Sequence, residues 1–379
     1  MKVYADYAAT TNVAPDVVAE ITKVLRDHFG NASSIHNVGR DGRRILDQAR
    51  SIIAKTLNAT PREIIFTSGA TESNNLAIKG VAYQNQHMGK HLITTSIEHH
   101  SVLHVFEQLE KEGFDVTYLP VDAKGFISID TLKQALRDDT ILVSIMFGNN
   151  EVGTVQPIDE IAELLKDHQA LFHTDGVQTI GHMPIDIKAL NVDLFTVTAH
   201  KFYGPKGVGL LYVKDKTPIQ FQQLGGAQET KRRAGTENIA YIAGMAKALE
   251  LVTENIEASN VHLANLKQTF INALQSNEVP FEMNGDMNIT LPHITNLYFP
   301  FSDVEKMLTI LDMNGVYVSS GSACTAGSIE PSHVLTAMFG EHPRTKQSIR
   351  FSFSHQNTEE EVVYIAEQIK KIYEMNRKE

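Results

Sequence analysis

The stretch TVTAHKFYGPKGVG (196–209) decides the fold, because two strand-like runs meet there at a glycine-rich turn. The run DLFTVT (193–198) alternates apolar and β-branched residues, as a strand does. The run GVGLLYV (207–213) has the composition of a returning strand. We therefore predict a β-hairpin with Lys201 at the end of its first strand.

The neighbours of Lys201 indicate a reactive amine. His200, Phe202 and Tyr203 would exclude water from it, which lowers the pKa of an amine and prepares it for Schiff-base chemistry. The alternative is an ordinary surface lysine in a turn formed by residues 204–205. This stretch alone favours the alternative, because single lysines are common in turns.

A second stretch, ALFHTDGVQ (170–178), changes that balance because its apolar run ends in Asp175. In a chain of alternating strands and helices, ligands bind where strands end. A lysine and an aspartate at neighbouring strand ends are what pyridoxal phosphate requires. The lysine holds the aldehyde, and the carboxylate keeps the pyridine nitrogen protonated. The two residues together therefore predict a pyridoxal-phosphate site.

Composition limits the class of protein. The chain has 379 residues, of which 42% are hydrophobic and 21% charged, as expected for a globular protein with a large core. A formal charge of -11 argues against a general nucleic-acid or anionic-membrane surface, although a local basic patch could recruit RNA. The single cysteine excludes an internal disulfide. Residues 1–11 have no apolar core of signal-peptide length and no apolar run reaches membrane-spanning length, so we expect neither a signal peptide nor a membrane span. We expect a cytoplasmic protein.

Repeated strand and helix patterns predict an α/β fold whose mostly parallel sheet is covered on both faces by helices. We expect a large cofactor-binding domain over residues 12–254. A smaller α+β domain, residues 1–11 and 255–379, would carry the cysteine loop, and its last helix would begin at a capping box from Thr358 to Glu361.

Three local features bear on the site. Gly69 lies at a tight strand-to-helix turn, so Ala70 and Thr71 would open a helix whose backbone N–H groups can bind a phosphate; an ordinary capped turn is the alternative. Residues 28–40 are predicted to form a loop. The strand in KHLITTSIEHHSV (90–102) is predicted to end at its glutamate and two histidines.

The adjacent histidines, His99 and His100, also raise the question of a metal site. Neighbouring side chains on an extended segment point to opposite sides, and no cysteine or carboxylate spacing completes a zinc site. We therefore expect no metal. For His100 an ordinary capping or core role remains open.

The chain resembles the fold type I pyridoxal-phosphate enzymes, and among them the NifS/IscS-like cysteine desulfurases. The resemblance runs almost from end to end. The motifs that carry it are DYAATT (6–11), TSGATESNN (67–75), IEHHSV (97–102), NNEVGTVQPI (149–158), HTDGVQ (173–178), AHKFYGPKG (199–207), RRAGTEN (232–238), SSGSACTAG (319–327) and SIRFSF (348–353).

This resemblance implies a role for each site residue. Lys201 would carry pyridoxal phosphate, Asp175 would face the pyridine nitrogen, and His99 would stack on the ring and act as acid and base. The other implied cofactor contacts are Gln178 at the ring hydroxyl, Asn150, and, around the phosphate, Ala70, Thr71, Thr198, His200 and the partner subunit's Thr236. Thr198 replaces a serine more common in the family, and Ala227 departs from the usual triple glycine.

The resemblance also implies the reaction and its partners. L-cysteine, held by Arg350 and Asn150, would become L-alanine, with its sulfur taken as a persulfide on Cys324. Small residues around Cys324 predict a movable loop, which is typical of group I desulfurases. The enzyme would be an obligate homodimer that passes sulfur to an accepting protein, either an iron–sulfur cluster scaffold or a tRNA-thiolating enzyme.

Two rival functions remain open at this point. One is another pyridoxal-phosphate enzyme, such as an aminotransferase or a selenocysteine lyase, in which Cys324 would not be the nucleophile. The other is a non-catalytic scaffold for sulfur-accepting proteins, since a fold alone does not establish function. The joint presence of Lys201, Asp175, His99 and Cys324 argues against the scaffold.

Overall fold

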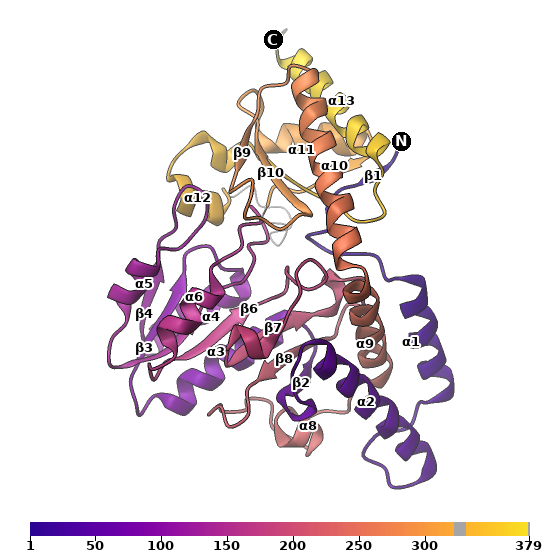
Figure 1. Cartoon of the computed structure of the whole chain (residues 1–379), viewed down its shortest axis with the longest axis vertical. Helices are drawn as coiled ribbons and strands as arrows, with labels where there is room; N and C mark the ends of the chain where they lie inside the picture. Colours follow the sequence, from indigo (N-terminus) through magenta and orange to yellow (C-terminus); the bar gives the residue numbers. More distant parts are fainter. Residues whose placement is uncertain (322–330, 378–379) are drawn as a thin grey trace.

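A seven-stranded sheet forms the centre of the computed structural model, which describes residues 1–321 and 331–377 (Figure 1). The strand order is β2-β8-β7-β6-β5-β3-β4, and β8 alone runs antiparallel to its neighbours. The strands are β2 (Ile64–Thr67), β3 (His91–Thr95), β4 (Asp115–Leu119), β5 (Thr140–Ser144), β6 (Leu171–Asp175), β7 (Leu194–Thr198) and β8 (Gly209–Val213). The predicted hairpin is confirmed, since Thr198 pairs with Gly209 at its closed end.

Helices cover both faces of this sheet because its strands are apolar on both sides. Along β2, Ile64 and Phe66 enter one hydrophobic core and Ile65 enters the other, as the two-residue period of a strand requires. The first core contains α1 (Pro15–Asp27), α2 (Asn37–Thr56), α6 (Ile158–Leu165) and α9 (Ile239–Glu254), and the second contains α3 (Ala70–Asn85) and α4 (His100–Lys111). Shorter helices are α5 (Ile129–Ala135), α7 (Ile187–Leu190) and α8 (Gln228–Lys231).

A second, antiparallel sheet of order β12-β10-β9 lies above the first in Figure 1. Its own apolar core includes residues of the three long helices beside it. The elements here are α10 (Ile256–Ser276), β9 (Glu282–Asn284), β10 (Ile294–Tyr298), α11 (Val304–Met313), α12 (His333–Phe339), β12 (Ser348–Ser352) and α13 (Glu359–Asn376). The capping box at Thr358 and Glu361 is confirmed. The exact domain limits, 12–254 against 1–11 with 255–379, stay a prediction.

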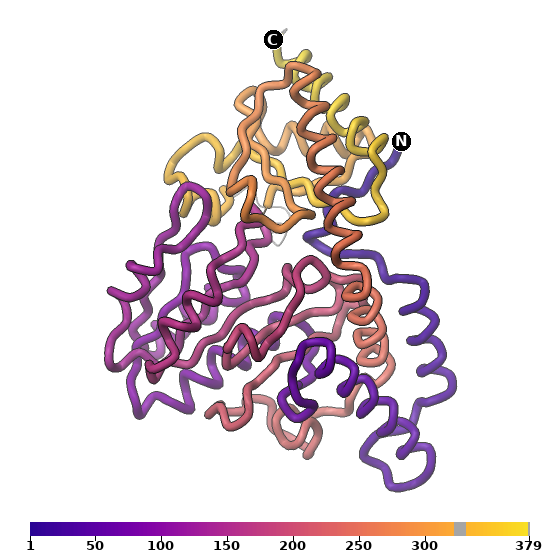
Figure 2. The backbone as a smooth tube through the Cα atoms, in the orientation of Figure 1, coloured from indigo at the N-terminus to yellow at the C-terminus, as the bar shows by residue number. Residues whose placement is uncertain are grey.

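The N-terminal arm crosses from the second sheet to the first, as the indigo tube in Figure 2 shows. β1 (Val3–Tyr4) pairs in parallel with β11 (Val316–Tyr317), and Asp6 bridges to Ser352. The arm therefore contacts the late part of the chain before it reaches α1. Within the described part of the chain, no helix combines the length and apolarity needed to cross a bilayer.

Two local predictions are wrong. The loop predicted over residues 28–40 ends early, because α2 begins at Asn37, where the His36 imidazole accepts a hydrogen bond from Gly39 N. The strand predicted to reach the two histidines ends at Thr95. His99 instead caps α4, since its Nδ1 accepts from Ser101 N at 3.1 Å, and His100 is the first helical residue.

Candidate active site

A cavity of about 540 Å³ lies at the carboxyl ends of β2, β6 and β7. Parallel strands direct these ends to one edge of the sheet, so residues far apart in sequence meet there. Every predicted site residue except Thr236 and Cys324 lines this cavity. These residues are Ala70, Thr71, His99, Asn150, Asp175, Gln178, Thr198, His200, Lys201 and Arg350.

Lys201 ends a short 3-10 turn that follows β7 directly. Its Nζ donates hydrogen bonds to two carbonyls of the N-terminal arm, Ala8 O at 2.5 Å and Ala9 O at 2.8 Å. The arm is itself attached to this turn, because Thr11 Oγ1 donates to His200 O at 3.1 Å. The lysine is thus held at the edge of the cavity by acceptors that an incoming group can replace.

Asp175 is the last residue of β6 and is buried. Its Oδ2 accepts from Asn74 Nδ2 at 2.8 Å, and its Oδ1 accepts from Val177 N at 3.0 Å. Burial raises the pKa of this carboxyl, and these two hydrogen bonds with the charge of Lys201 oppose that rise. A cationic group placed beside Asp175 would therefore be strongly favoured.

Asn74 and Ser101 connect Asp175 to His99. Asn74 Nδ2 also bonds Ser101 Oγ at 2.9 Å, and Ser101 Oγ lies 2.8 Å from His99 Nδ1. Burial first, then the positive charge of Lys201, lowers the pKa of His99 to about 4. The imidazole is therefore neutral at neutral pH. Sequence reasoning did not single out Asn74 or Ser101, although both lie inside quoted motifs.

The start of α3 forms another wall of the cavity. Gly69 takes φ +152° there, and no side chain caps the helix. Any Cβ at Gly209 would collide with the Cα of Gly69, so β8 and this turn approach each other as only glycines allow. The first N–H groups of a helix attract anions, and Ala70 and Thr71 carry them beside the cavity.

Arg350 enters the cavity from β12 of the second sheet and is buried. Its Nη2 donates to Asp6 Oδ1 at 2.8 Å, and its Nη1 donates to Asn150 O at 2.8 Å and to Gly321 O at 3.2 Å. Its Nε finds no acceptor among the described residues. Arg350 thus retains a buried donor for a ligand.

Gln178 is held by two partners. Its Nε2 donates to Ala8 O at 3.0 Å, and its Oε1 lies 3.2 Å from His293 Nε2. Because Nε2 of the amide faces a carbonyl, Oε1 must face the donor of His293. The amide therefore has a fixed orientation at the cavity wall.

Of the four remaining predicted residues, two line the cavity, one lies outside it and one is not described. Thr198 and His200 line the cavity and contact neighbouring polar groups, Thr198 Oγ1 with Val208 O at 3.4 Å and His200 Nδ1 with Thr10 Oγ1 at 3.2 Å. Thr236 is exposed and does not line it. Cys324 lies outside the described residues.

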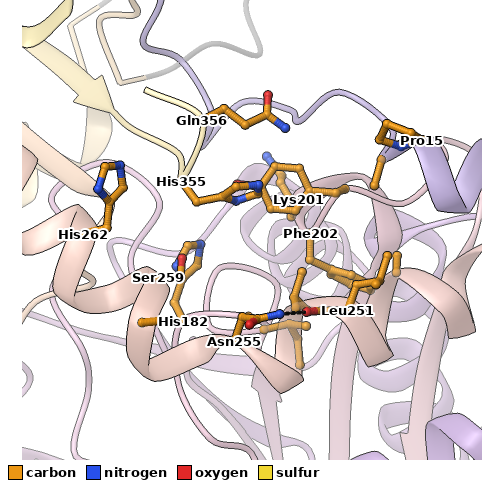
Figure 3. A pocket seen from close by; sticks show the side chains of 17 residues that line it. Pro15, His182, Lys201, Phe202, Leu251, Asn255, Ser259, His262, His355 and Gln356 are labelled. Atoms are coloured by element: carbon orange, nitrogen blue, oxygen red, sulfur yellow. Dashed lines mark hydrogen bonds between the residues drawn. The ribbon is translucent and has the colours of Figure 1, made fainter. Parts of the chain in front are cut away.

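A second cavity, of about 470 Å³, also includes Lys201 in its lining (Figure 3). It lies between the start of α1, the junction of α9 with α10, and residues 355–356. Its described lining is largely apolar, has no acidic side chain, and includes the imidazoles of His182, His262 and His355. No three His, Cys, Asp or Glu side chains in residues 1–321 and 331–377 are placed to share a metal ion.

Comparison with known proteins gives consistent matches. The aminotransferase class-V family model matches residues 3–365. The putative cysteine desulfurase IscS 1 of Bacillus subtilis (strain 168) is 52% identical over 369 residues, covering 97% of each chain. Cysteine desulfurase IscS of Clostridium botulinum (strain Hall) is 47% identical over 99% of this chain and 95% of that protein.

Solved structures agree with these relatives. A NifS-like protein superposes with a TM-score of 0.93 at 37% identity, covering 99% of this chain and 100% of that one. A structure titled "SspA in complex with cysteine" superposes with a TM-score of 0.82 at 38% identity, covering 94% and 99%.

Proposed function

Because this chain belongs to the aminotransferase class-V family and is a cysteine desulfurase of fold type I, we propose that it converts L-cysteine to L-alanine with Cys324 as the sulfur acceptor. The observation that carries the proposal is the placement of Lys201 and Asp175 in one cavity, with His99 joined to Asp175 through Asn74 and Ser101.

The residues around the cavity suit both the phosphate and the ring of pyridoxal phosphate. The uncapped start of α3, with Ala70 and Thr71, would hold the phosphate together with Thr198 and His200. The buried carboxyl of Asp175 matches a protonated pyridine nitrogen, and Lys201 supplies the amine for the aldehyde. When bound, pyridoxal phosphate supplies an electron sink for the charge that develops at the substrate's Cα.

His99 and Lys201 would divide the proton transfers between them. Lys201 Nζ donates to two carbonyls of the N-terminal arm beside the cavity, and in its neutral form this amine would take the Cα proton. His99 is neutral, and its Nδ1 accepts a hydrogen bond from Ser101 N, which aligns the ring at the cavity wall and leaves its one proton on Nε2. In this form His99 would act as the proton donor.

Arg350 and Asn150 would hold the substrate carboxylate. The buried Nε of Arg350 has no acceptor among the described residues, and a carboxylate would satisfy it. Asp6 on Nη2 fixes the plane of the guanidinium. The arginine is thus pre-oriented for a small anionic substrate.

The sulfur step balances without an external oxidant. The Cys324 thiolate attacks the substrate sulfur, an S–S bond forms, and the C–S bond breaks with its electron pair staying on carbon. That carbon takes a proton and becomes the methyl group of alanine. L-cysteine and one enzyme thiol therefore give L-alanine and one enzyme persulfide.

We further propose a homodimer in the cytoplasm in which the partner subunit's Thr236 completes the phosphate site. Thr236 is exposed, and the monomer also exposes apolar side chains, among them Phe29, Ile35 and Leu224, that a second copy would cover. The persulfide would pass to an iron–sulfur cluster scaffold or a tRNA-thiolating enzyme.

Stoichiometry and intact mass test this function. The purified protein with L-cysteine and a reductant should release alanine and sulfide in equal amounts without a keto-acid co-substrate. Without a reductant, the mass should rise by one sulfur atom on the only cysteine. Dependence on a keto acid would indicate an aminotransferase, and alanine from L-selenocysteine alone would indicate a selenocysteine lyase. Normal alanine production by Cys324→Ala would exclude the proposed sulfur step.

A further inference from the structure

Glu151 is a buried carboxyl that the steps above do not use. It is 1% exposed and lies in the turn over residues 150–152, after β5. Asn149 Oδ1 accepts from Glu151 N at 2.8 Å, and Asn296 Nδ2, from β10, donates to Glu151 O at 3.1 Å. Its backbone is therefore held by contacts from both sheets.

The side chain of Glu151 lies next to a described residue on each side of residues 322–330, namely Gly321 before them and Ser332 after them. On the far side, Ser332 Oγ donates to Glu151 Oε2 at 2.5 Å. On the near side, Gly321 lies so close that a Cβ there would collide with the same oxygen. Gly321 also takes φ +96°, which glycine favours. Both flanks of the section that carries Cys324 thus converge on one carboxylate oxygen.

Each flank is also attached to the candidate site. Arg350 Nη1 donates to Gly321 O at 3.2 Å. Ser332 Oγ caps α12 by accepting from Leu335 N at 3.0 Å, and α12 packs its apolar side chains against the first sheet's edge at Ile97 and Met146. The positions of both flanks are therefore defined relative to the cavity.

We propose that Glu151 is a positioning residue for sulfur transfer, which bonds Ser332, packs against Gly321 and so fixes the two described flanks of the section that contains Cys324. The proposal rests on the proposed function and adds a residue to it. Burial raises the pKa of Glu151, while the hydrogen bond from Ser332 and the charges of Arg350 and His100 oppose the rise. The carboxyl is therefore held by its contacts and not by water.

Two substitutions separate this role from cofactor chemistry. Glu151→Ala removes the shared oxygen, whereas Glu151→Gln keeps an oxygen that can accept from Ser332. In Glu151→Ala, the absorbance change on mixing with L-cysteine should stay within about twofold of wild type, but single-turnover persulfide formation on Cys324, followed by intact mass, should slow by about 10- to 100-fold. Glu151→Gln should recover most of that loss.

Alkylation gives a readout that does not depend on turnover. Because Cys324 is the only thiol, iodoacetamide labelling of the pyridoxal-phosphate-loaded enzyme reports on it alone. Its rate should change in Glu151→Ala and stay near wild type in Glu151→Gln. Glu63→Gln is the matched control, since Glu63 is also buried but caps a turn before β2, at the opposite end of the strands.

The outcomes are distinct. Equal slowing of the absorbance change and of persulfide formation would mean general damage to the site and would overturn the positioning role. An unchanged persulfide rate in Glu151→Ala would overturn it as well. If wild type itself gains no sulfur on Cys324, the proposed function fails first, independently of Glu151.

Discussion

The two cavities that share Lys201 are similar in volume, about 540 and 470 Å³, but differ in what lines them. The first, the polar cavity, collects Asp175, His99, Arg350 and an uncapped helix start. The second, the apolar cavity, is bounded mainly by aliphatic side chains and three imidazoles. The backbone explains this difference: strand ends and a helix N-terminus direct polar groups into the first, whereas a helix–helix junction bounds the second.

The comparison teaches that cavity size does not identify an active site. What distinguishes the polar cavity is that buried groups of opposite charge line it. Asp175 and Arg350 are both buried, and hydrogen bonds from Asn74 to Asp175 and from Arg350 to Asp6 fix their directions. Because these charged groups line only the polar cavity, substitutions there should affect turnover much more than substitutions in the apolar cavity.

Lys201→Ala should have the largest effect. Loss of the amine should abolish borohydride-dependent labelling with pyridoxal phosphate and reduce turnover by about 1,000-fold or more. Peptide mapping of the reduced wild-type protein should place the label on Lys201. Lys216→Ala, at an exposed lysine, serves as the control. A label on any other lysine would contradict the assignment.

Asp175→Asn should rank second. The substitution keeps the shape of the side chain but removes the charge that would face the pyridine nitrogen, so turnover should fall by about 100-fold or more. The cofactor's absorbance maximum should shift as well. A variant with normal turnover and an unchanged spectrum would remove Asp175 from the proposed cofactor site.

Mixing two inactive variants tests whether the polar cavity needs Thr236 from a second chain. Thr236→Ala and Lys201→Ala proteins should each be weakly active or inactive. Mixing them should restore about a quarter of the wild-type sites, because half the dimers would be hybrids with one intact site each. Hybrids that stay inactive under conditions of demonstrated subunit exchange would place Thr236 within its own chain's site or outside any site.

His182, in the apolar cavity, should affect stability and not catalysis. Burial lowers its pKa to about 4, with the charge of His355 adding to the effect, against about 6.5 when unfolded. The unfolded chain therefore binds more protons between these values, and stability falls as the pH drops from 6.5 towards 4.

His182→Asn should remove this pH dependence. Denaturant unfolding at pH 6.5 and 5.5 should show the wild type losing on the order of 1 kcal/mol more than the variant over that unit. The comparison with the variant is needed because Glu98, whose pKa burial raises to about 8, acts in the opposite direction. Parallel stability curves for the two proteins would contradict the assigned pKa.

The smallest effect is expected from filling the apolar cavity. Ala258→Leu adds three carbons to its wall on α10 and should change turnover by less than about twofold. Ala70→Leu adds the same group to the polar cavity at the start of α3 and should reduce turnover by about tenfold or more. If the two substitutions changed the steady-state rate equally, the two cavities would not differ in their importance for turnover.

The sequence predicted elements whose signals are local. The hairpin of β7 and β8, the strand ending at Asp175 and the capping box at Thr358 all follow from short patterns of apolar and polar residues. The resemblance then supplied the list of site residues. Ten of them line the polar cavity, which agrees with that list without testing each role.

The remaining features of the site depended on individual hydrogen bonds, which no pattern of apolar and polar residues predicts. Asn74 bonds Asp175 and Ser101, which lie 101 and 27 positions further along the sequence, and helical periodicity does not reveal such contacts. His99 was predicted at the end of a strand because the largely β-branched run 93–97 before it is typical of strands, but its ring bonds a backbone N–H and caps α4. A tertiary hydrogen bond therefore explains Asn74, and a local helix cap explains His99.

Contacts of the N-terminal arm delay assembly of the site until most of the chain has been synthesised. Val3 and Asp6 leave the ribosome early, yet they pair with Val316, Ser352 and the guanidinium of Arg350. The arm's Ala8 and Ala9 carbonyls can hold the Lys201 amine in place only after those partners have been synthesised. A nascent chain that ends before residue 352 therefore contains the lysine without the surroundings that direct it.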